Sequence, residues 1–397
     1  MIRDAEITDR KTWNNCFRGA DIVQNEKLNV CFIGPLPPPV TGLSKALDTI
    51  LNSERCQRQF NFNVIDLGKI YPVSGSKLSA GKIAGFFRLH RLVKAAMKAG
   101  STDIYYLAIA QSTVGVLRDL MILQLIRRDK RKKQVIVHLH GGGFQNFYRQ
   151  ANSVLQRMIR RGYRVVTKAV VLGDALCGMF EGILPEDKIC VVPNCVDDKM
   201  LLPGQEAAEK AENVLQKKRL QVLYLSNMIR EKGYPEVLEA AKRCGEKMDF
   251  IFAGKFYSEA EEEGFLKELK EEHLDAFVRF AGVVQGKEKK RLLKESDIFV
   301  LPTYYPHEGQ PITIIEAMSA GMAVICTDHA GIRDLVADKE NAIYVRAKCP
   351  EDICDALEKL NRDREWLKNL SRANREKVLA EFTEEKYITR MAEVLSR

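Results

Sequence analysis

Residues 308–316 read Glu-Gly-Gln-Pro-Ile-Thr-Ile-Ile-Glu, with a carboxylate at each end and no other charge between them. An apolar run at 297–302 precedes this segment and another at 323–326 follows it, which predicts strand, loop, helix and strand in that order. Glu308 then lies in a loop at the carboxyl end of a buried strand, and Glu316 lies in the first turns of the next helix. Open α/β sheets bind their ligands at that edge.

The helix start and the two carboxylates indicate the chemistry of this segment. Pro311 suits the first helical position, and the free backbone N–H groups there can receive an anion such as a diphosphate. Carboxylates accept hydrogen bonds from hydroxyl groups, so Glu308 and Glu316 suit a ligand that is part sugar and part nucleotide. The alternative is a capping glutamate and an unrelated solvated one, which is the better interpretation for either residue taken alone.

Residues 308–325, EGQPITIIEAMSAGMAVI, resemble the donor-site signature of the retaining family 4 glycosyltransferases, which have the GT-B fold. The resemblance extends from about Cys31 to Val345 through further blocks that keep the family's order. It implies an α/β protein of the GT-B fold, in which two Rossmann-like parallel-sheet domains face each other across a cleft.

Composition is consistent with two domains. The chain has 397 residues, of which 46% are hydrophobic and 29% charged, as in ordinary soluble globular proteins. No apolar run reaches the roughly 18 residues of a membrane-spanning helix, and the amino end lacks the apolar core of a secretory signal. The ten cysteines include no Cys-x-x-Cys pair and suggest neither a disulfide framework nor a zinc site. A reducing cytoplasm is the expected compartment.

Runs of apolar and β-branched residues alternate with helical patterns in both halves, which predicts parallel sheets covered on both faces. The predicted strands of the first half are 28–33, 63–67, 104–109, 135–140, 169–172 and 189–192, and those of the second half are 221–225, 249–253, 277–281, 297–301, 323–326 and 342–345. We divide the chain into a polar amino-terminal extension (1–27), an acceptor-binding domain (28–196), a nucleotide-sugar-binding domain (197–380) and a carboxyl-terminal helix (381–397). The resemblance implies that this last helix crosses back onto the first domain.

The loop at 34–44 directly follows the first strand and begins a helix. Its prolines stiffen it, and Gly42 allows backbone to approach a ligand closely. A phosphate-binding P-loop is rejected because the Gly-Lys-Ser/Thr ending is missing. The loop is similar to the first loop of the family, although Thr41 replaces the first of two adjacent glycines there. The resemblance gives Gly42 a contact to the donor.

His138-Leu139-His140-Gly141-Gly142-Gly143 ends the fourth strand, and alternation puts both histidines on one face. A metal pair is not expected, because no third ligand is evident. A lone histidine in an apolar strand is more often a satisfied core residue. The block resembles the family's histidine at this strand end, which implies that His140 faces the donor sugar while His138 is structural.

Two further blocks carry the resemblance into the second half. Residues 192–197 are similar to the domain-junction motif, with Cys195 where glycine is usual. In Leu225–Gly233 the family has arginine where Asn227 stands and lysine at Lys232, whose charge can meet a diphosphate. We expect Arg230 to supply part of the missing charge; the alternative for both cations is a solvated loop.

By this resemblance Glu316 holds the ribose hydroxyls, Glu308 holds the donor sugar, and backbone at the end of strand 280–284 reads the nucleobase. The predicted catalytic residues are His140 and Glu308, and no metal site is predicted. The predicted donor-binding residues are Gly42, Asn227, Arg230, Lys232, Val284, Gly309, Gln310, Pro311, Ile312, Thr313 and Glu316.

Positive charge is concentrated in the first half. Residues 1–196 contain 29 Lys and Arg against 15 Asp and Glu, a net +14, whereas the remainder contains 33 against 38, a net −5. Basic stretches at 82–94, 127–133 and 157–161 mix cations with apolar residues, as membrane-surface helices do. Solvated helix faces are the alternative. No nucleic-acid-binding motif accompanies the charge.

The sequence therefore predicts a retaining, metal-independent glycosyltransferase that moves a sugar from a UDP- or GDP-linked donor to a hydroxyl acceptor. A lipid-linked saccharide in bacterial surface polysaccharide assembly is the expected acceptor, an anionic membrane surface is a possible partner, and no cofactor is expected. The predicted location is cytoplasmic, with peripheral docking on the inner face of the cell membrane. Two alternatives stay open: a nucleotide-sugar epimerase of the same fold, and a non-catalytic sugar-nucleotide binding protein.

Overall fold

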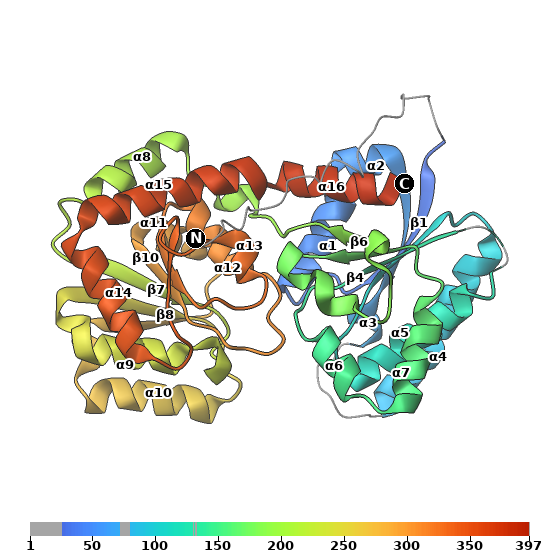
Figure 1. Cartoon of the computed structure of the whole chain (residues 1–397), viewed down its shortest axis with the longest axis horizontal. Helices are drawn as coiled ribbons and strands as arrows, with labels where there is room; N and C mark the ends of the chain where they lie inside the picture. Colours follow the sequence, from blue (N-terminus) through green and yellow to red (C-terminus); the bar gives the residue numbers. More distant parts are fainter. Residues whose placement is uncertain (1–25, 72–79, 130, 132, 397) are drawn as a thin grey trace, which may run out of the picture.

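The computed structural model describes residues 26–71, 80–129, 131 and 133–396 (Figure 1). All but two residues of the predicted extension 1–27 lie outside these ranges. The rest of the chain forms two parallel sheets of six strands, each covered by helices on both faces. The α/β prediction of two parallel-sheet domains is therefore confirmed.

The first sheet has the strand order β2-β1-β3-β4-β5-β6, and all its pairs are parallel. Its strands are β1 (Leu28–Gly34), β2 (Phe60–Asp66), β3 (Ile104–Ala108), β4 (Gln134–His138), β5 (Lys168–Val171) and β6 (Ile189–Val191). Its main helices are α1 (Gly42–Asn52), α2 (Glu54–Gln59), α3 (Leu67–Ile70), α4 (Ala80–Ala99), α5 (Thr113–Ile126), α6 (Phe144–Gln150) and α7 (Ser153–Tyr163). Side chains of successive strand residues point to opposite faces, so they contribute to two separate apolar cores.

The second sheet has the order β12-β11-β10-β7-β8-β9 and is also parallel. Its strands are β7 (Leu220–Leu225), β8 (Met248–Ala253), β9 (Val278–Gly282), β10 (Ile298–Leu301), β11 (Ala323–Cys326) and β12 (Ala342–Tyr344). Its helices are α8 (Gly204–Asn213), α9 (Tyr234–Cys244), α10 (Glu259–Glu271), α11 (Gly286–Glu295), α12 (Ile312–Ser319), α13 (Ile332–Leu335), α14 (Pro350–Arg362) and α15 (Arg364–Glu381).

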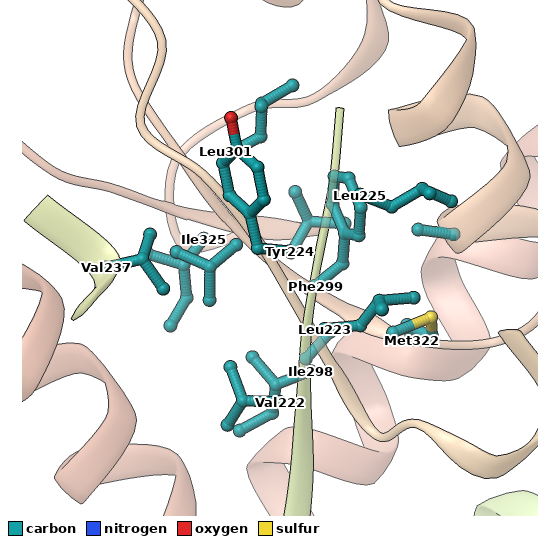
Figure 2. Close-up of a cluster of buried hydrophobic side chains, with 14 of the residues drawn as sticks. Val222, Leu223, Tyr224, Leu225, Val237, Ile298, Phe299, Leu301, Met322 and Ile325 are labelled. Atoms are coloured by element: carbon teal, nitrogen blue, oxygen red, sulfur yellow. The ribbon is translucent and has the colours of Figure 1, made fainter. Parts of the chain in front are cut away.

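The centre of this sheet is wholly apolar. Figure 2 shows side chains of β7 and β10 packed together with Val237 of α9 and Ile325 of β11. Phe299 and Tyr224 are among the largest fully buried side chains of the protein. Strand order reverses at β7, whose neighbours are β10 and β8, and the loops after β7 and β10 consequently spread apart to leave a crevice at the carboxyl edge. Most of the predicted donor residues follow these two strands, whereas Val284 follows β9 and Gly42 begins α1 of the first domain.

The chain passes between the two halves at two neighbouring places. Val196 follows β6, and its N–H donates to the carbonyl of Phe382, which separates α15 from the last helix α16 (Glu384–Ser396). Figure 1 shows α15 along the second sheet and α16 over the first. Tyr387 of α16 is fully buried against α1, where its hydroxyl donates to the Ala46 carbonyl at 3.2 Å. The two crossings thus form one hinge.

None of the helices within the described ranges combines the length and the apolar character that a membrane span requires.

Candidate active site

The candidate site lies where loops of the two sheets touch. The loop after β4 meets the loop after β10: the N–H of Gly142 donates to the carbonyl of His307 at 3.4 Å. A Cβ atom added to Gly142 would collide with the Glu308 carbonyl oxygen, and one added to Gly309 would collide with that of His140. Glycine is required here because two backbones occupy the space that side chains would fill.

The first predicted carboxylate is paired with the predicted diphosphate cation. Lys232 Nζ donates to Glu308 Oε2 at 2.5 Å, and Thr303 Oγ1 donates to the same oxygen at 3.2 Å. Only 6% of Glu308 is exposed. Lys232 stands beside Gly233, whose φ of +86° and contact with Pro302 exclude any other residue type. The sequence predicted separate roles for the two side chains, and the structure brings them into one ion pair.

The second carboxylate, Glu316 of α12, is paired with a lysine that sequence reasoning missed. Lys289 Nζ of α11 lies 2.6 Å from Glu316 Oε1 and 2.5 Å from Oε2. Burial raises the pKa of Glu316, while the charge and hydrogen bond of Lys289 oppose that rise. The charged run 287–291 looks like a solvated helix face, but its nearness to Val284, the predicted base-binding position, was an available signal.

His140 lies at the carboxyl end of β4 and stacks on His138, with ring centroids 3.9 Å apart. His138 Nδ1 is 2.5 Å from the Tyr106 hydroxyl, whereas the Nε2 atoms of both histidines are buried without a protein partner in the described structure. Burial lowers the pKa of His140 to about 3 and that of His138 well below its usual value. Both imidazoles are therefore neutral, and His140 retains hydrogen-bonding capacity.

The first loop places Gly42 beside the donor helix. A Cβ added to Gly42 would lie 3.2 Å from Ile312 Cδ1 at the start of α12. Thr41 caps α1: its hydroxyl accepts from Ser44 N at 3.1 Å, and Ser44 Oγ accepts from Thr41 N at 2.8 Å. This reciprocal capping gives Thr41 a structural reason to replace the family's glycine.

Gln310 holds the domain junction. Its Oε1 accepts from Asn194 N at 2.7 Å, and its carbonyl accepts from Asn194 Nδ2 at 2.9 Å. Both residues are buried. Gln310 therefore ties the loop that carries Glu308 to the chain crossing that precedes Cys195, a function that was not evident from its predicted place among the donor-binding residues.

The remaining predicted residues surround the same crevice. Asn227 and Arg230 are exposed after β7, Val284 is buried after β9, and Pro311 and Thr313 begin α12. Among the described residues, no group of three or more His, Cys, Asp or Glu side chains lies close enough together to hold a metal ion.

Comparison with known proteins identifies the second half. Residues 205–377 match the family model of glycosyl transferases group 1. Among curated relatives, N,N'-diacetylbacillosaminyl-diphospho-undecaprenol alpha-1,3-N-acetylgalactosaminyltransferase of Campylobacter jejuni is 27% identical over 194 residues, which cover 48% of this chain and 49% of the relative. The putative teichuronic acid biosynthesis glycosyltransferase TuaC of Bacillus subtilis is 28% identical over 40% of this chain and 38% of its own. The chain thus spans about half the length, or less, of these relatives.

Solved structures resemble the whole chain. Anabaena HepE in complex with UDP superposes with a TM-score of 0.70 at 14% identity, covering 93% of this chain and 100% of that one. Sucrose-phosphate synthase of Thermosynechococcus elongatus gives a TM-score of 0.72 at 15% identity, covering 93% and 98%. These similarities show the GT-B fold.

The glycine contact between the two loops predicts the effect of an added methyl group. Gly142→Ala places a Cβ against the Glu308 carbonyl, so we expect the loops to separate and the two domains to open about their hinge. Small-angle X-ray scattering should give a larger radius of gyration for this variant than for wild type. Gly178→Ala, where an added Cβ meets nothing within 4 Å, is the matched control. Equal radii for the two variants would contradict a closing function of this contact.

The buried histidines predict a pH-dependent stability. Because burial lowers the pKa of His140 from 6.5 to about 3, the unfolded chain binds more protons than the folded protein between these values. The free energy of unfolding should therefore fall as the pH drops from 7 to 5, and His140→Gln should reduce that fall. Urea denaturation across this range measures the slope, and the same comparison at pH 8.5 gives the pH-independent cost of the substitution. An unchanged slope would show that His140 charges freely in the folded protein.

Proposed function

Since residues 205–377 match the family model of group 1 glycosyl transferases and the chain has the GT-B fold, we propose that the protein is a retaining glycosyltransferase. Its donor is a UDP- or GDP-linked sugar and its acceptor carries a hydroxyl group. The observation that carries this proposal is the convergence of Lys232, Glu308 and Glu316 from one domain with the His140 loop from the other.

The proposed reaction needs positioning and charge stabilisation. The acceptor oxygen bonds to the anomeric carbon on the face that the diphosphate leaves, the bond between that carbon and the phosphate oxygen breaks, and the acceptor proton passes to the departing phosphate. Lys232 and the amides at the start of α12 stabilise the charge on the diphosphate, which requires no metal ion and no further cofactor. Domain closure excludes water that would otherwise hydrolyse the donor.

Donor binding requires an ion pair to separate. Lys232 Nζ lies 2.5 Å from Glu308 Oε2, and this pairing compensates two charged groups that would be costly to bury alone. With donor, Lys232 turns to the diphosphate and Glu308 accepts from the sugar hydroxyls. Glu316 likewise exchanges part of its contact with Lys289 for the ribose. The two lysines hold the carboxylates of Glu308 and Glu316 in fixed positions.

The two alternatives are less well supported by these contacts. An epimerase would use the same crevice but needs no surface for an acceptor. A non-catalytic binding protein was suggested by departures at Thr41, Cys195 and Asn227, yet Thr41 has a capping role and the loop of His140 contacts the loop of Glu308. Activity is thus the better interpretation.

The acceptor surface is proposed on the first domain. Helices α4 and α7 both pack on α5, and Figure 1 shows all three on the same side of the first sheet. We call this region the basic apolar face, defined by the exposed residues Ile83, Phe87, Arg88, Arg91, Leu92, Lys94, Leu117, Val154, Arg157, Met158, Arg160 and Arg161. Of the stretch 127–133, Arg131 binds the carbonyls of Met97 and Gly100 at the end of α4, while Lys130 and Lys132 lie outside the described residues.

This face is suited to an anionic membrane surface. Apolar side chains can enter the headgroup region while each Lys or Arg contributes about 1 kcal/mol of attraction. Docking at the inner face of the cell membrane would bring the cleft to a lipid-linked saccharide of surface polysaccharide assembly. A relative whose name includes diphospho-undecaprenol supports this acceptor class.

Donor recognition predicts a ligand-dependent stabilisation. A thermal-shift screen against UDP- and GDP-sugars should raise the melting temperature with one nucleotide class, since a ligand at a hundredfold excess over its Kd adds about 2.7 kcal/mol. Glu316→Ala and Lys232→Ala should lose this response, whereas Glu288→Ala, at an exposed position of α11, should keep it. No response to any donor in wild type would favour the non-catalytic alternative.

The same screen tests the proposed compensation by Arg230. If Arg230 supplies charge in place of the family's arginine at Asn227, Arg230→Ala should weaken donor binding by a smaller factor than Lys232→Ala. Unchanged affinity in Arg230→Ala would contradict the compensation and leave the donor site itself intact.

Membrane docking predicts that flotation depends on the apolar part of the basic apolar face. Wild type should float with vesicles containing phosphatidylglycerol and less with neutral vesicles. The double variant Phe87→Ser, Leu92→Ser should float less, because it removes two exposed apolar side chains from α4. Leu379→Ser is the control, because Leu379 of α15 is exposed to a similar extent as Leu92 and lies outside the basic apolar face. This variant should bind vesicles like wild type. No preference for anionic vesicles in wild type would contradict the proposal.

A further inference from the structure

A polar cluster lies at the carboxyl edge of the first sheet, between α4 and α5. Arg118 of α5 pairs with its neighbour Asp119: Arg118 Nε and Nη2 lie 2.8 Å and 2.7 Å from Asp119 Oδ1. Asp119 is 1% exposed, and its other oxygen accepts from the N–H of Ala110, directly after β3, at 2.8 Å. The buried carboxylate therefore holds the guanidinium in a fixed orientation, with 15% of the Arg118 side chain still exposed.

A tyrosine beside this pair has an unused hydroxyl. The Tyr71 hydroxyl is buried and has no hydrogen-bond partner in the described structure. Its ring packs on α4, where a Cβ added to Gly85 would lie 2.5 Å from Tyr71 Cε1. The rings of Tyr71 and Phe86 make a T-shaped contact with their centroids 6.3 Å apart. Burial raises the pKa of Tyr71, and the charges of Arg118 and Asp119 act on it as well. Because a buried hydroxyl without a partner is costly, this position is suited to a ligand that accepts a hydrogen bond from it.

The cluster lies between the cleft and the basic apolar face. On the cleft side, Gln111 follows Ala110, and its Oε1 accepts from the N–H of Gly143, three residues after His140, at 2.5 Å. On the other side, Tyr71 packs on the turn of α4 that also carries the exposed Phe87. Gln111, the residue beside Asp119's partner Ala110, thus connects to the loop of His140, and Tyr71 connects to α4, while the charges of Arg118 and Asp119 act on Tyr71.

We propose that Arg118 and Tyr71 bind the phosphate or diphosphate group of a lipid-linked acceptor. This inference rests on the proposed function and adds the place at which the acceptor's anionic group is recognised. In such an acceptor the phosphate joins lipid to sugar, and in the protein the cluster joins the basic apolar face to the cleft. The order of chemical groups therefore matches the order of sites.

The chemistry of the cluster favours phosphate over a neutral sugar. Asp119 uses Nε and one Nη of Arg118, which leaves guanidinium N–H groups able to donate to phosphate oxygens in parallel. Tyr71 adds a hydroxyl donor. The cations of α4 and α7 give the surroundings a positive field that attracts an anion and offsets the charge of Asp119.

Prenyl diphosphate binding tests this site on the full chain. Isothermal titration would compare farnesyl diphosphate with farnesol, with the donor crevice filled by saturating UDP or GDP so that its diphosphate site is blocked. Wild type should bind farnesyl diphosphate at least about tenfold more tightly than farnesol, as expected for charge-assisted hydrogen bonds. Arg118→Gln should abolish this preference, and Tyr71→Phe should reduce it several-fold.

Two controls separate recognition from folding and from general charge. Tyr71→Phe keeps the packed ring and removes only an unpartnered hydroxyl, so it should not lower the melting temperature, while Arg118→Lys keeps a cation beside Asp119 and should still lose most of the preference because the planar fork is gone. Arg127→Gln removes an exposed cation elsewhere and should behave like wild type. A wild-type protein without preference for the diphosphate, or a preference that survives in Arg118→Gln, would overturn the proposal. Nucleotide stabilisation is read separately, so a failed donor screen would count against the proposed function instead.

Discussion

The close approach of two backbones across the cleft constrains the rest of the molecule. Gly142 and Gly309 leave no room for a Cβ atom, so the loop that ends β4 lies directly against the loop that ends β10. Each loop is held by its own sheet, and the carboxyl edges of both sheets must therefore face each other. His140 reaches the crevice of the opposite domain only because this contact is made without side chains. The glycines thus allow loops of the two domains to contact each other and to contribute to one site.

The two chain crossings lie together. The hydrogen bond from Val196 to Phe382 joins them, and α16 stays packed on the first domain through Tyr387, so a rotation of the domains would centre on this narrow region. Gln310 links this region to the donor loop through Asn194. A rotation of the domains about this region would therefore move the loop that carries Glu308, two residues before Gln310. In the proposed function, domain closure and the position of the donor-binding loop are coupled in this way.

Local patterns were sufficient to predict two parallel-sheet domains. The periodicity of strands and helices is set by residues close together in the sequence, and so are the effects of Pro311 and the glycines. They also placed Glu308 and Lys232 after buried strands, where the structure has them. The contact partners of the site residues could not be predicted from the sequence. Lys289 contacts Glu316 across 27 residues, and Asn194 contacts Gln310 across 116. Such pairs depend on how helices are placed on the sheet, which a charge pattern in a single sequence does not specify.

The buried polar groups of the cleft follow one physical rule. Each carboxylate is already balanced by a cation, and each imidazole is kept neutral by burial, so the empty site carries no uncompensated buried charge. In the proposed function, the diphosphate of the donor takes over the contact of Lys232, and hydroxyl groups of the donor take over contacts of Glu308 and Glu316. The buried atoms of the described cleft residues that have no hydrogen-bond partner include the Nε2 atoms of both histidines, Asn194 Oδ1, Gln310 Nε2 and Glu316 Oε2, and the last of these still lies in an ion pair with Lys289. On the proposed function, selectivity follows because a ligand without hydroxyls or phosphates would separate these ion pairs without supplying replacements, and separated buried charges are costly.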